Sequence, residues 1–408
     1  MDQSRCSYGW VVVAVSATVN LLAWSVRATF GLFYVKLLGE FGWRRGDAAI
    51  GYSLSWLLLL LFSPLFGRLS DLWGARLLVV AGALVLGSAL ALTGHVTTLW
   101  QYCLAFGVLG AAGVGGIQTP AATIVNRWFR ESRGTAMGVV SAGASASAIV
   151  FYPLNAWLIV TFGWRSAFVI FGAVVALIAI PLAGLFYREP PDDLEIIPPS
   201  GAAAHDWTLA KALCSRSFWA VFAMWGLGVI GYQIVTTHQV AHAVDRGFSP
   251  ITLGWVFGLA GACTVAGNLL GGWLSDRCGR ETVFALGSAI AIAGIGALGA
   301  LGGPDDLLLL LLYAASGVGF GMRIALLTAI PADLFEGRNL GVILGAAHGG
   351  GGLGGFIGPY LGGWLFDVTG SYQVAFAVAA LTMGASAVAA WMAAPRRARA
   401  VSTPRLDG

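Results

Sequence analysis

The chain has 408 residues, of which 58% are hydrophobic and only 10% are charged, and its formal net charge is +4. Soluble domains carry about 25% charged residues, so this composition excludes an ordinary water-soluble protein and indicates that lipid covers the surface. The net charge is small and dispersed, which argues against a nucleic-acid-binding protein. The five cysteines show no paired or metal-type spacing, so neither a disulfide framework nor a zinc site is predicted.

Long apolar stretches follow one another along the chain, separated by short polar turns. The first begins without a signal-peptide cleavage pattern and is expected to remain in the protein. Each stretch is long enough to cross about 30 Å of hydrocarbon as an α-helix. The sequence therefore predicts an all-α membrane protein with twelve transmembrane helices, near residues 8–35, 47–68, 77–95, 98–127, 134–160, 165–187, 217–240, 250–274, 282–302, 306–332, 340–366 and 372–394.

One segment, residues 188–216, differs from the rest because it is rich in proline and acidic residues. It predicts a cytoplasmic linker between an N-terminal six-helix bundle (1–187) and a C-terminal six-helix bundle with a short tail (217–408). Sixteen of the 23 Lys and Arg residues fall on the side of the termini and the linker, and five fall on the opposite side. The positive-inside rule then places both termini in the cytoplasm of a multi-pass inner-membrane protein.

The two halves repeat each other. GRLSDLWGAR at 67–76 and GWLSDRCGRE at 272–281 are 205 residues apart, each between the second and third helix of its half. Such a repeat predicts two pseudo-symmetric bundles with a substrate site near the midplane. The motif carboxylates are expected to cap helices or pair with arginines such as Arg130. We assign the gating role to Gly67, Asp71, Arg76, Asp276, Arg133 and Arg338.

With both loop motifs present, the chain resembles the major facilitator superfamily (MFS) of transporters. Within it, the chain looks most like bacterial relatives of the monocarboxylate and oxalate–formate transporters. This likeness rests on Tyr8-Gly9-Trp10 and on the stretches 127–143, 162–168 and 367–372. Those families carry an arginine in span eight, where this chain has Gly267 and Asn268. The resemblance implies the MFS fold and alternating access.

Two arginines lie well inside predicted spans, Arg27 in span one and Arg323 in span ten, whereas all 19 Asp and Glu residues lie in loops or at span ends. The resemblance implies that both spans line the central cavity. Buried cations without a protein carboxylate predict that the substrate supplies the anion. Arg323 is the first candidate ligand, helped by Arg27 and by Gln118, which lies 205 residues before Arg323. Alternatively, Arg27 reaches the interface or backbone carbonyls, Arg323 seals a gate, and Gln118 makes an interhelical hydrogen bond.

Further candidates come from aromatic and titratable side chains. His348 in span eleven and His238 near the outer end of span seven are candidates for carrying a coupled proton. His348 fits a neutral hydrogen-bonding role between helices equally well, and the glycine-rich run 349–355 predicts close helix packing. Weaker candidates for substrate contact are Tyr52, Tyr152 and Tyr232, with Trp24 and Trp56 as further aromatic residues, although packing is the commoner role of such side chains.

Together these features predict a secondary transporter of a small organic anion, first of all a monocarboxylate, coupled to a proton or to a counter-anion. We expect a monomer that needs no cofactor. An enzyme is not predicted, because no nucleophile–base pair or metal cluster is present. Two alternatives stay open, namely an exporter of drugs or other hydrophobic solutes and a non-transporting membrane receptor on the same fold.

Overall fold

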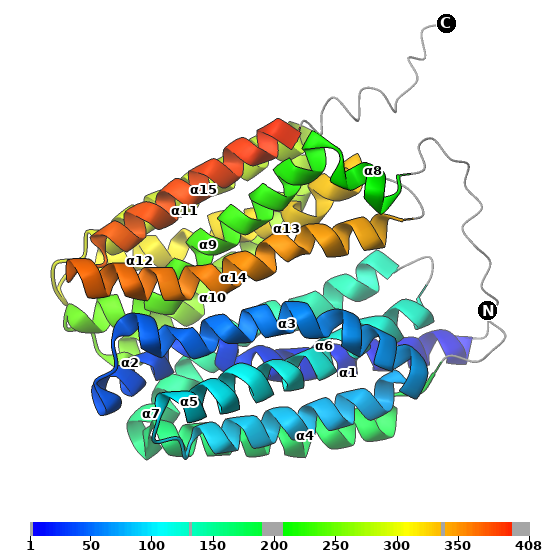
Figure 1. Ribbon diagram of the computed structural model, residues 1–408, viewed down its shortest axis with the longest axis horizontal. Helices are drawn as coiled ribbons and strands as arrows, with labels where there is room; N and C mark the ends of the chain where they lie inside the picture. The colour runs from blue at the N-terminus through cyan, green and yellow to red at the C-terminus, as the bar shows by residue number, and fades with distance from the viewer. Residues whose placement is uncertain (1–2, 130–132, 190–206, 336–338, 394–408) are drawn as a thin grey trace, which may run out of the picture. The chain divides into compact units, whose positions relative to one another are not determined.

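The computed structural model describes residues 3–129, 133–189, 207–335 and 339–393, whose regular structure is helical throughout (Figure 1). The first half contains α1 (Gln3–Ala28), α2 (Phe30–Phe41), α3 (Arg45–Trp73), α4 (Ala75–Thr93), α5 (Leu99–Tyr102), the π-helical segment η1 (Cys103–Leu109), α6 (Gly110–Trp128) and α7 (Arg133–Phe186). The second half contains α8 (Leu209–Leu213), α9 (Arg216–Asp245), α10 (Pro250–Cys278), α11 (Arg280–Gly299), α12 (Leu307–Ala315), α13 (Gly317–Leu334), α14 (Leu340–Thr369) and α15 (Gln373–Ala393).

Eleven described segments are long and apolar enough to cross a membrane, and one of them, within α7, is much longer than a single crossing. The 54 residues of α7 would extend about 81 Å as one straight helix, far more than a bilayer is thick. Gly163 interrupts the helix with φ 80° and ψ 157°, a conformation that favours glycine. Because α7 thus contains two crossings, the described residues give twelve, and the predicted all-α membrane fold is confirmed.

Three predicted spans are each built from shorter helices. Span ten consists of α12 and α13, which are separated by Ser316. Span one consists of α1 and α2, which meet at Thr29, directly after Ala28. Span four begins as α5, continues through η1 and ends as α6. π-Helical turns inside membrane helices are often found at functional sites. The interruptions of spans one and four lie close to the candidate site described below.

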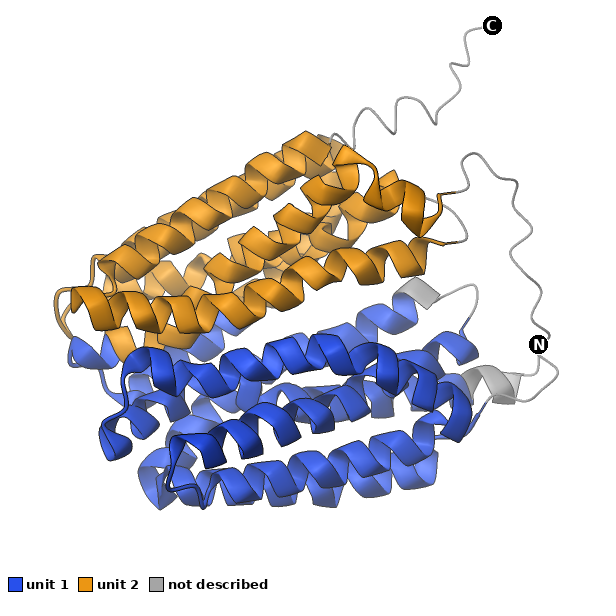
Figure 2. Ribbon diagram, in the orientation of Figure 1, with its two compact units in different colours: residues 1–197, 243–261 blue, residues 198–242, 262–408 orange. Residues whose placement is uncertain are grey.

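The described residues form two compact units (Figure 2). Unit 1 comprises residues 1–197 and 243–261, and unit 2 comprises residues 198–242 and 262–408. The first change of unit falls inside the predicted linker, and the short helix α8 also lies there. Residues 243–261 follow span seven in the chain but group with unit 1. The predicted bundle boundaries at 187 and 217 stay a prediction.

Small residues allow the helices of each unit to approach closely. In unit 1, a Cβ on Gly82 of α4 would lie 2.7 Å from the backbone of Gly116 of α6. In unit 2, a Cβ on Gly271 of α10 would lie 2.6 Å from the backbone of Met322 of α13. Conversely, large apolar side chains such as Leu177 and Leu269, each 74% exposed, cover the outside of the helices. This arrangement is that of helices packed in lipid.

The two loop motifs have matching backbone geometry. Gly74 ends α3 with φ 80° and ψ 150°, and its N–H donates to the carbonyl of Ser70 over 3.1 Å. Gly279 precedes α11 with φ 90° and ψ 147°, and its N–H donates to the carbonyl of Ser275 over 3.1 Å. Since these glycines are 205 residues apart, the sequence repeat is also a repeat of local structure.

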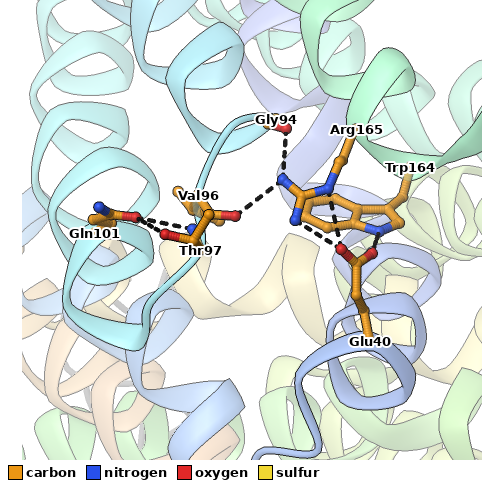
Figure 3. A network of polar contacts seen from close by, with 7 residues as sticks. All are labelled: Glu40, Gly94, Val96, Thr97, Gln101, Trp164 and Arg165. Carbon is orange, nitrogen blue, oxygen red and sulfur yellow. Dashed lines mark hydrogen bonds and ion pairs between the residues drawn. The ribbon is translucent and has the colours of Figure 1, made fainter.

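A polar network fixes one end of unit 1 around Arg165, which follows the interruption of α7 (Figure 3). The guanidinium donates to the carbonyls of Gly94 and Val96, over 3.1 and 2.9 Å, and pairs with the carboxylate of Glu40 over 2.7 Å. Trp164 Nε1 donates to the second oxygen of Glu40. Arg165 therefore joins the turn of α7, the end of α2 and the loop after α4.

Candidate functional site

The candidate site surrounds Arg27, at the end of α1. Its side chain is only 5% exposed. The guanidinium carbon lies 4.8 Å from the ring centroid of Trp56, 5.4 Å from that of Tyr52 and 5.5 Å from that of Trp24. Trp24 is on α1, whereas Tyr52 and Trp56 are four residues apart on α3 and thus share one face. Three aromatic rings stabilise the buried cation through cation–π attraction.

Hydrogen bonds fix this arrangement. Arg27 Nη1 donates to Ser55 Oγ over 2.8 Å, and Ser55 Oγ donates to the carbonyl of Tyr52 over 2.6 Å. The Tyr52 hydroxyl donates to the carbonyl of Arg27 over 3.3 Å. Phe30, at the start of α2, stacks on the Tyr52 ring at 4.4 Å. The end of α1, the start of α2 and one face of α3 are therefore held together.

The same cluster has an excess of hydrogen-bond donors. Arg27 Nε and Nη2, Trp24 Nε1 and Trp56 Nε1 are buried and have no hydrogen-bond partner among the described residues. Each such group costs about 1–3 kcal/mol when it is left unsatisfied. All four atoms are N–H donors, so an acceptor, and an anion above all, would satisfy them.

An apolar cavity adjoins Arg27. It is lined from α1, α4, η1 and α6, with Arg27 as its charged lining residue, and the other lining residues are Ala23, Ser25, Val26, Leu86, Ala89, Leu90, Phe106, Gly110 and Val114. The π-helical segment contributes Phe106 to this lining. At about 10 Å³ this cavity has room for about one water molecule, so it marks an apolar face beside the cation rather than a space that holds a whole substrate.

Arg323, on α13, lies in unit 2 and is 4% exposed. Its Nη2 donates to Ser386 Oγ over 3.0 Å, and Ser386 Oγ donates to the carbonyl of Met224 over 2.6 Å. The guanidinium carbon is 5.0 Å from the Phe284 ring centroid. Its Nε has no hydrogen-bond partner among the described residues. Arg323 therefore links α9, α11, α13 and α15 inside unit 2, and the prediction that it binds substrate stays a prediction.

The remaining substrate candidates are not part of the Arg27 cluster. Gln118 is half-buried on α6. The Tyr152 ring lies 5.6 Å from that of Phe257, and the Tyr232 ring meets that of Phe320 at 5.5 Å. Of the three predicted tyrosines, Tyr52 lies against Arg27, Tyr152 lies against Phe257 in the same unit, and Tyr232 lies against Phe320 in unit 2. Sequence analysis overlooked Ser55, whose position three residues after Tyr52 was the available signal.

The two histidine candidates differ in their hydrogen bonding. His238 Nε2 bonds the carbonyl of Pro359 over 2.8 Å. His348 meets the ring of Trp225 edge to face at 4.2 Å, and no hydrogen bond joins it to another described residue. A third histidine, His242, was not a candidate, and its Nε2 bonds the carbonyl of Leu298 over 2.9 Å. His348 is therefore the one of these three without a backbone acceptor in the described part of the chain.

The loop motifs form ion-pair networks. Arg127, at the end of α6, pairs with Asp71 at 2.9 Å and with Glu189 at 3.0 Å. Arg280 pairs with Asp276 at 2.7 Å and with Asp333 at 3.2 Å. Neither arginine was among the predicted partners of the motif carboxylates. Of the expected ones, Arg130 and Arg338 lie outside the described residues, as does the side chain of Arg133. Gly67 is half-buried, Arg76 is exposed, and the gating role of the motif stays a prediction.

The absence of an arginine in span eight has a steric explanation. A Cβ on Gly267 of α10 would lie well inside van der Waals contact with the backbone of Val318 on α13. Any side chain at this position would push the two helices apart. The close packing of α10 and α13 therefore excludes an arginine at residue 267.

Comparisons with known proteins agree with this architecture. The family model of the Major Facilitator Superfamily matches residues 13–245 and 238–407. Human monocarboxylate transporter 11 is 28% identical over 90% of this chain and 79% of its own length. Rat monocarboxylate transporter 13 is 26% identical over 91% of this chain and 86% of its own length.

Among solved structures, a bacterial homolog of the human lysosomal transporter Spinster, in an inward-facing and occupied conformation, superposes with a TM-score of 0.76. The alignment covers 97% of this chain and 98% of that one at 15% identity, so it supports the fold alone. The chain belongs to the Major Facilitator Superfamily and is a multi-pass membrane transporter related to the monocarboxylate transporters.

Proposed function

We propose that this protein transports a small monocarboxylate whose carboxylate binds at Arg27. The observation that carries the proposal is the set of four buried N–H donors around Arg27, which have no acceptor among the described residues. A carboxylate offers two oxygens with about four lone-pair sites, enough to accept from Arg27 and from both indoles. Arginine suits this role because its planar guanidinium binds a carboxylate in two places and stays charged.

The surroundings favour a substrate with a single negative charge. Arg27 is the one charged residue of the cluster and of the cavity lining. A second carboxylate on the substrate would enter an apolar cavity without a partner, which is costly. The names of the relatives, monocarboxylate transporters 11 and 13, agree with this substrate class.

Transport is proposed to be secondary, by alternating access, with a proton or a counter-anion as the coupled ion and with the protein acting as a monomer. The excess of Lys and Arg on one side supports an inner-membrane location with cytoplasmic termini. The motif networks around Arg127 and Arg280 are proposed to stabilise one state of the transport cycle. The pair of Arg127 with the exposed Asp71 can break at small cost, whereas the pair of Arg280 with Asp333, whose side chains are 15% and 20% exposed, costs more to break.

Uptake of labelled lactate or pyruvate into proteoliposomes, with a panel of organic acids as competitors, tests the proposal. Two free guanidinium N–H groups contribute about 1.5–3 kcal/mol each when they bind a charged acceptor. Arg27→Gln should therefore weaken substrate binding at least about 100-fold. Arg27→Lys keeps the charge but loses the planar guanidinium, so its substrate affinity should lie between those of the wild type and Arg27→Gln.

Arg44→Gln is the matched control, because Arg44 is exposed and lies outside both the cluster and the loop motifs, and it should transport like the wild type. Arg323→Ala tests whether the second buried arginine also binds substrate. If both arginines bind it, Arg323→Ala and Arg27→Gln should lower the substrate affinity equally. Unchanged saturable uptake by folded Arg27→Gln would contradict the assignment of the site. Failure of every monocarboxylate to enter or compete would contradict the substrate class.

A further inference from the structure

His348 on α14 differs from the other histidines inside the helices of unit 2. His238 and His242 each place Nε2 on a backbone carbonyl, which can only accept, so these nitrogens are donors in either protonation state. The ring nitrogens of His348 make no hydrogen bond to a described residue, and the side chain is half-buried. His348 can therefore gain or lose a proton without breaking a hydrogen bond to the protein.

Its one ring neighbour is held close by the packing of two helices. Trp225 of α9 meets His348 at 4.2 Å between ring centroids, with an interplanar angle of 80°. A Cβ on Gly354 of α14 would lie 2.5 Å from the carbonyl oxygen of Gly226, and one on Gly350 would overlap the backbone of Phe222. The two backbones are in contact along this run, so the packing of α9 on α14 holds residues 225 and 348 next to each other.

The same turn of α9 is bonded to the helix that carries Arg323. Trp225 Nε1 donates to the carbonyl of Leu327, one turn after Arg323 on α13, over 3.1 Å. The carbonyl of Met224 accepts from Ser386 Oγ, which in turn accepts from Arg323 Nη2. Residues 224 and 225 are therefore adjacent to His348 on one side and bonded to the surroundings of Arg323 on the other.

We propose that His348 is the proton-binding site of this transporter and that Trp225 transmits its charge state to α13. A positive imidazolium beside an indole is stabilised by cation–π attraction, which tightens the contact between α14 and α9. The bond from Trp225 to Leu327 then passes the change to the helix of Arg323. This inference rests on the proposed carboxylate transport and names its coupled ion.

Other charged groups on the packed elements do not substitute for His348. Four helices, namely α8, α9, α13 and α14 itself, carry other titratable or charged residues: Lys211, Arg216, Tyr232, His238, His242, Asp245, Arg323, Asp333, Tyr360 and Asp367. The helix α15 carries none between residues 373 and 393. Asp245 pairs with Arg45, and Asp333 pairs with Arg280. No carboxylate contacts His348 among the described residues.

A spectroscopic titration tests the proton site without any substrate. Indole emission of the purified protein, which has 16 tryptophans, is measured from pH 5 to pH 8, the range in which histidine normally titrates. We expect a step in the wild type that is absent from both His348→Gln and Trp225→Phe. His95→Gln, which changes an exposed histidine after α4, should retain it. A step that persists in His348→Gln, or no step in the wild type, would overturn the proposal.

Transport provides the second measurement. An inward proton gradient should stimulate lactate uptake at least 10-fold in the wild type and not at all in His348→Gln, whereas exchange of labelled for unlabelled lactate at equal pH should continue in both. Gradient stimulation in His348→Gln would overturn the proposal. If His348→Gln does not fold, Trp225→Phe answers the same question. A wild type that shows the titration step but transports no carboxylate would reject the proposed function and keep the proton site.

Discussion

Replacing Trp56 by Phe tests whether the indole N–H of Trp56 binds substrate or whether the side chain only stabilises the fold. In the absence of substrate, the variant loses a buried N–H group that has no partner among the described residues, which should gain about 1–3 kcal/mol of stability. It also loses part of the half-buried ring and some cation–π attraction with Arg27, roughly 1–2 kcal/mol together. The two effects oppose each other, so the free energy of unfolding should lie between about 1 kcal/mol below and about 2 kcal/mol above that of the wild type.

Substrate binding should respond very differently. An N–H group that donates to a carboxylate contributes about 1.5–3 kcal/mol, so Trp56→Phe should raise the lactate concentration for half-maximal uptake roughly 10- to 150-fold. The assay pairs thermal unfolding, followed with a thiol-reactive dye, with concentration-dependent uptake into proteoliposomes.

Trp128→Phe is the matched control, because Trp128 is half-buried in the same unit and its Nε1 donates to the carbonyl of Arg188 over 2.9 Å. This variant should lose about 1 kcal/mol of stability and keep the affinity of the wild type. If Trp56→Phe instead loses as much stability as the control and keeps its affinity, the indole N–H is not a substrate ligand.

Two further predictions concern stability alone and use thermal unfolding as the measurement. Gly354→Ala should destabilise the protein by about 1–3 kcal/mol, because the added methyl group overpacks against Gly226. Its control is Gly345→Ala, whose Cβ meets nothing within 4 Å and which should be neutral or stabilising by up to about 1 kcal/mol. Equal effects of the two variants would contradict the close contact of α9 and α14. Arg165→Met should cost about 1–3 kcal/mol because it leaves the carbonyls of Gly94 and Val96 without this donor, and a cost no greater than that of Arg68→Met would show that the network around Arg165 is unimportant.

The architecture could be predicted from sequence because a bilayer imposes simple requirements on length and polarity. Twelve apolar runs and a motif repeated after 205 residues were sufficient, and even the division of α7 was predicted, as the break between the spans 134–160 and 165–187. The interruption of span one at Thr29 and the π-helical segment η1 could not be seen, since both are decided by tertiary packing rather than by composition.

The site was only partly predictable for a related reason. A buried arginine is conspicuous in a sequence, so Arg27 and Arg323 were both recognised, but hydropathy cannot tell which neighbours complete their hydrogen bonds. The grouping of Trp24, Ser55 and Trp56 around Arg27 depends on how α1 packs on α3. Likewise, the pairing of Asp71 with Arg127 depends on where α6 ends.

The different surroundings of the two buried arginines suggest a division of labour. Arg27 has two guanidinium nitrogens without a hydrogen-bond partner in the described part of the chain, next to two indoles of which the same is true and to a small apolar cavity. These free donors are the reason for proposing that an acceptor binds there. Arg323 has one unsatisfied nitrogen, and a Cβ on Gly228 would lie 2.7 Å from its guanidinium, which leaves little room for a ligand on that side. Arg323 is, however, bonded through Ser386 to the turn of α9 that contacts His348. The proposed binding at Arg27 and the proposed transmission at Arg323 rest on the same property, a buried charge without an ion-pair partner among the described residues. They differ in their surroundings, since a small apolar cavity adjoins Arg27 and Gly228 lies against the guanidinium of Arg323.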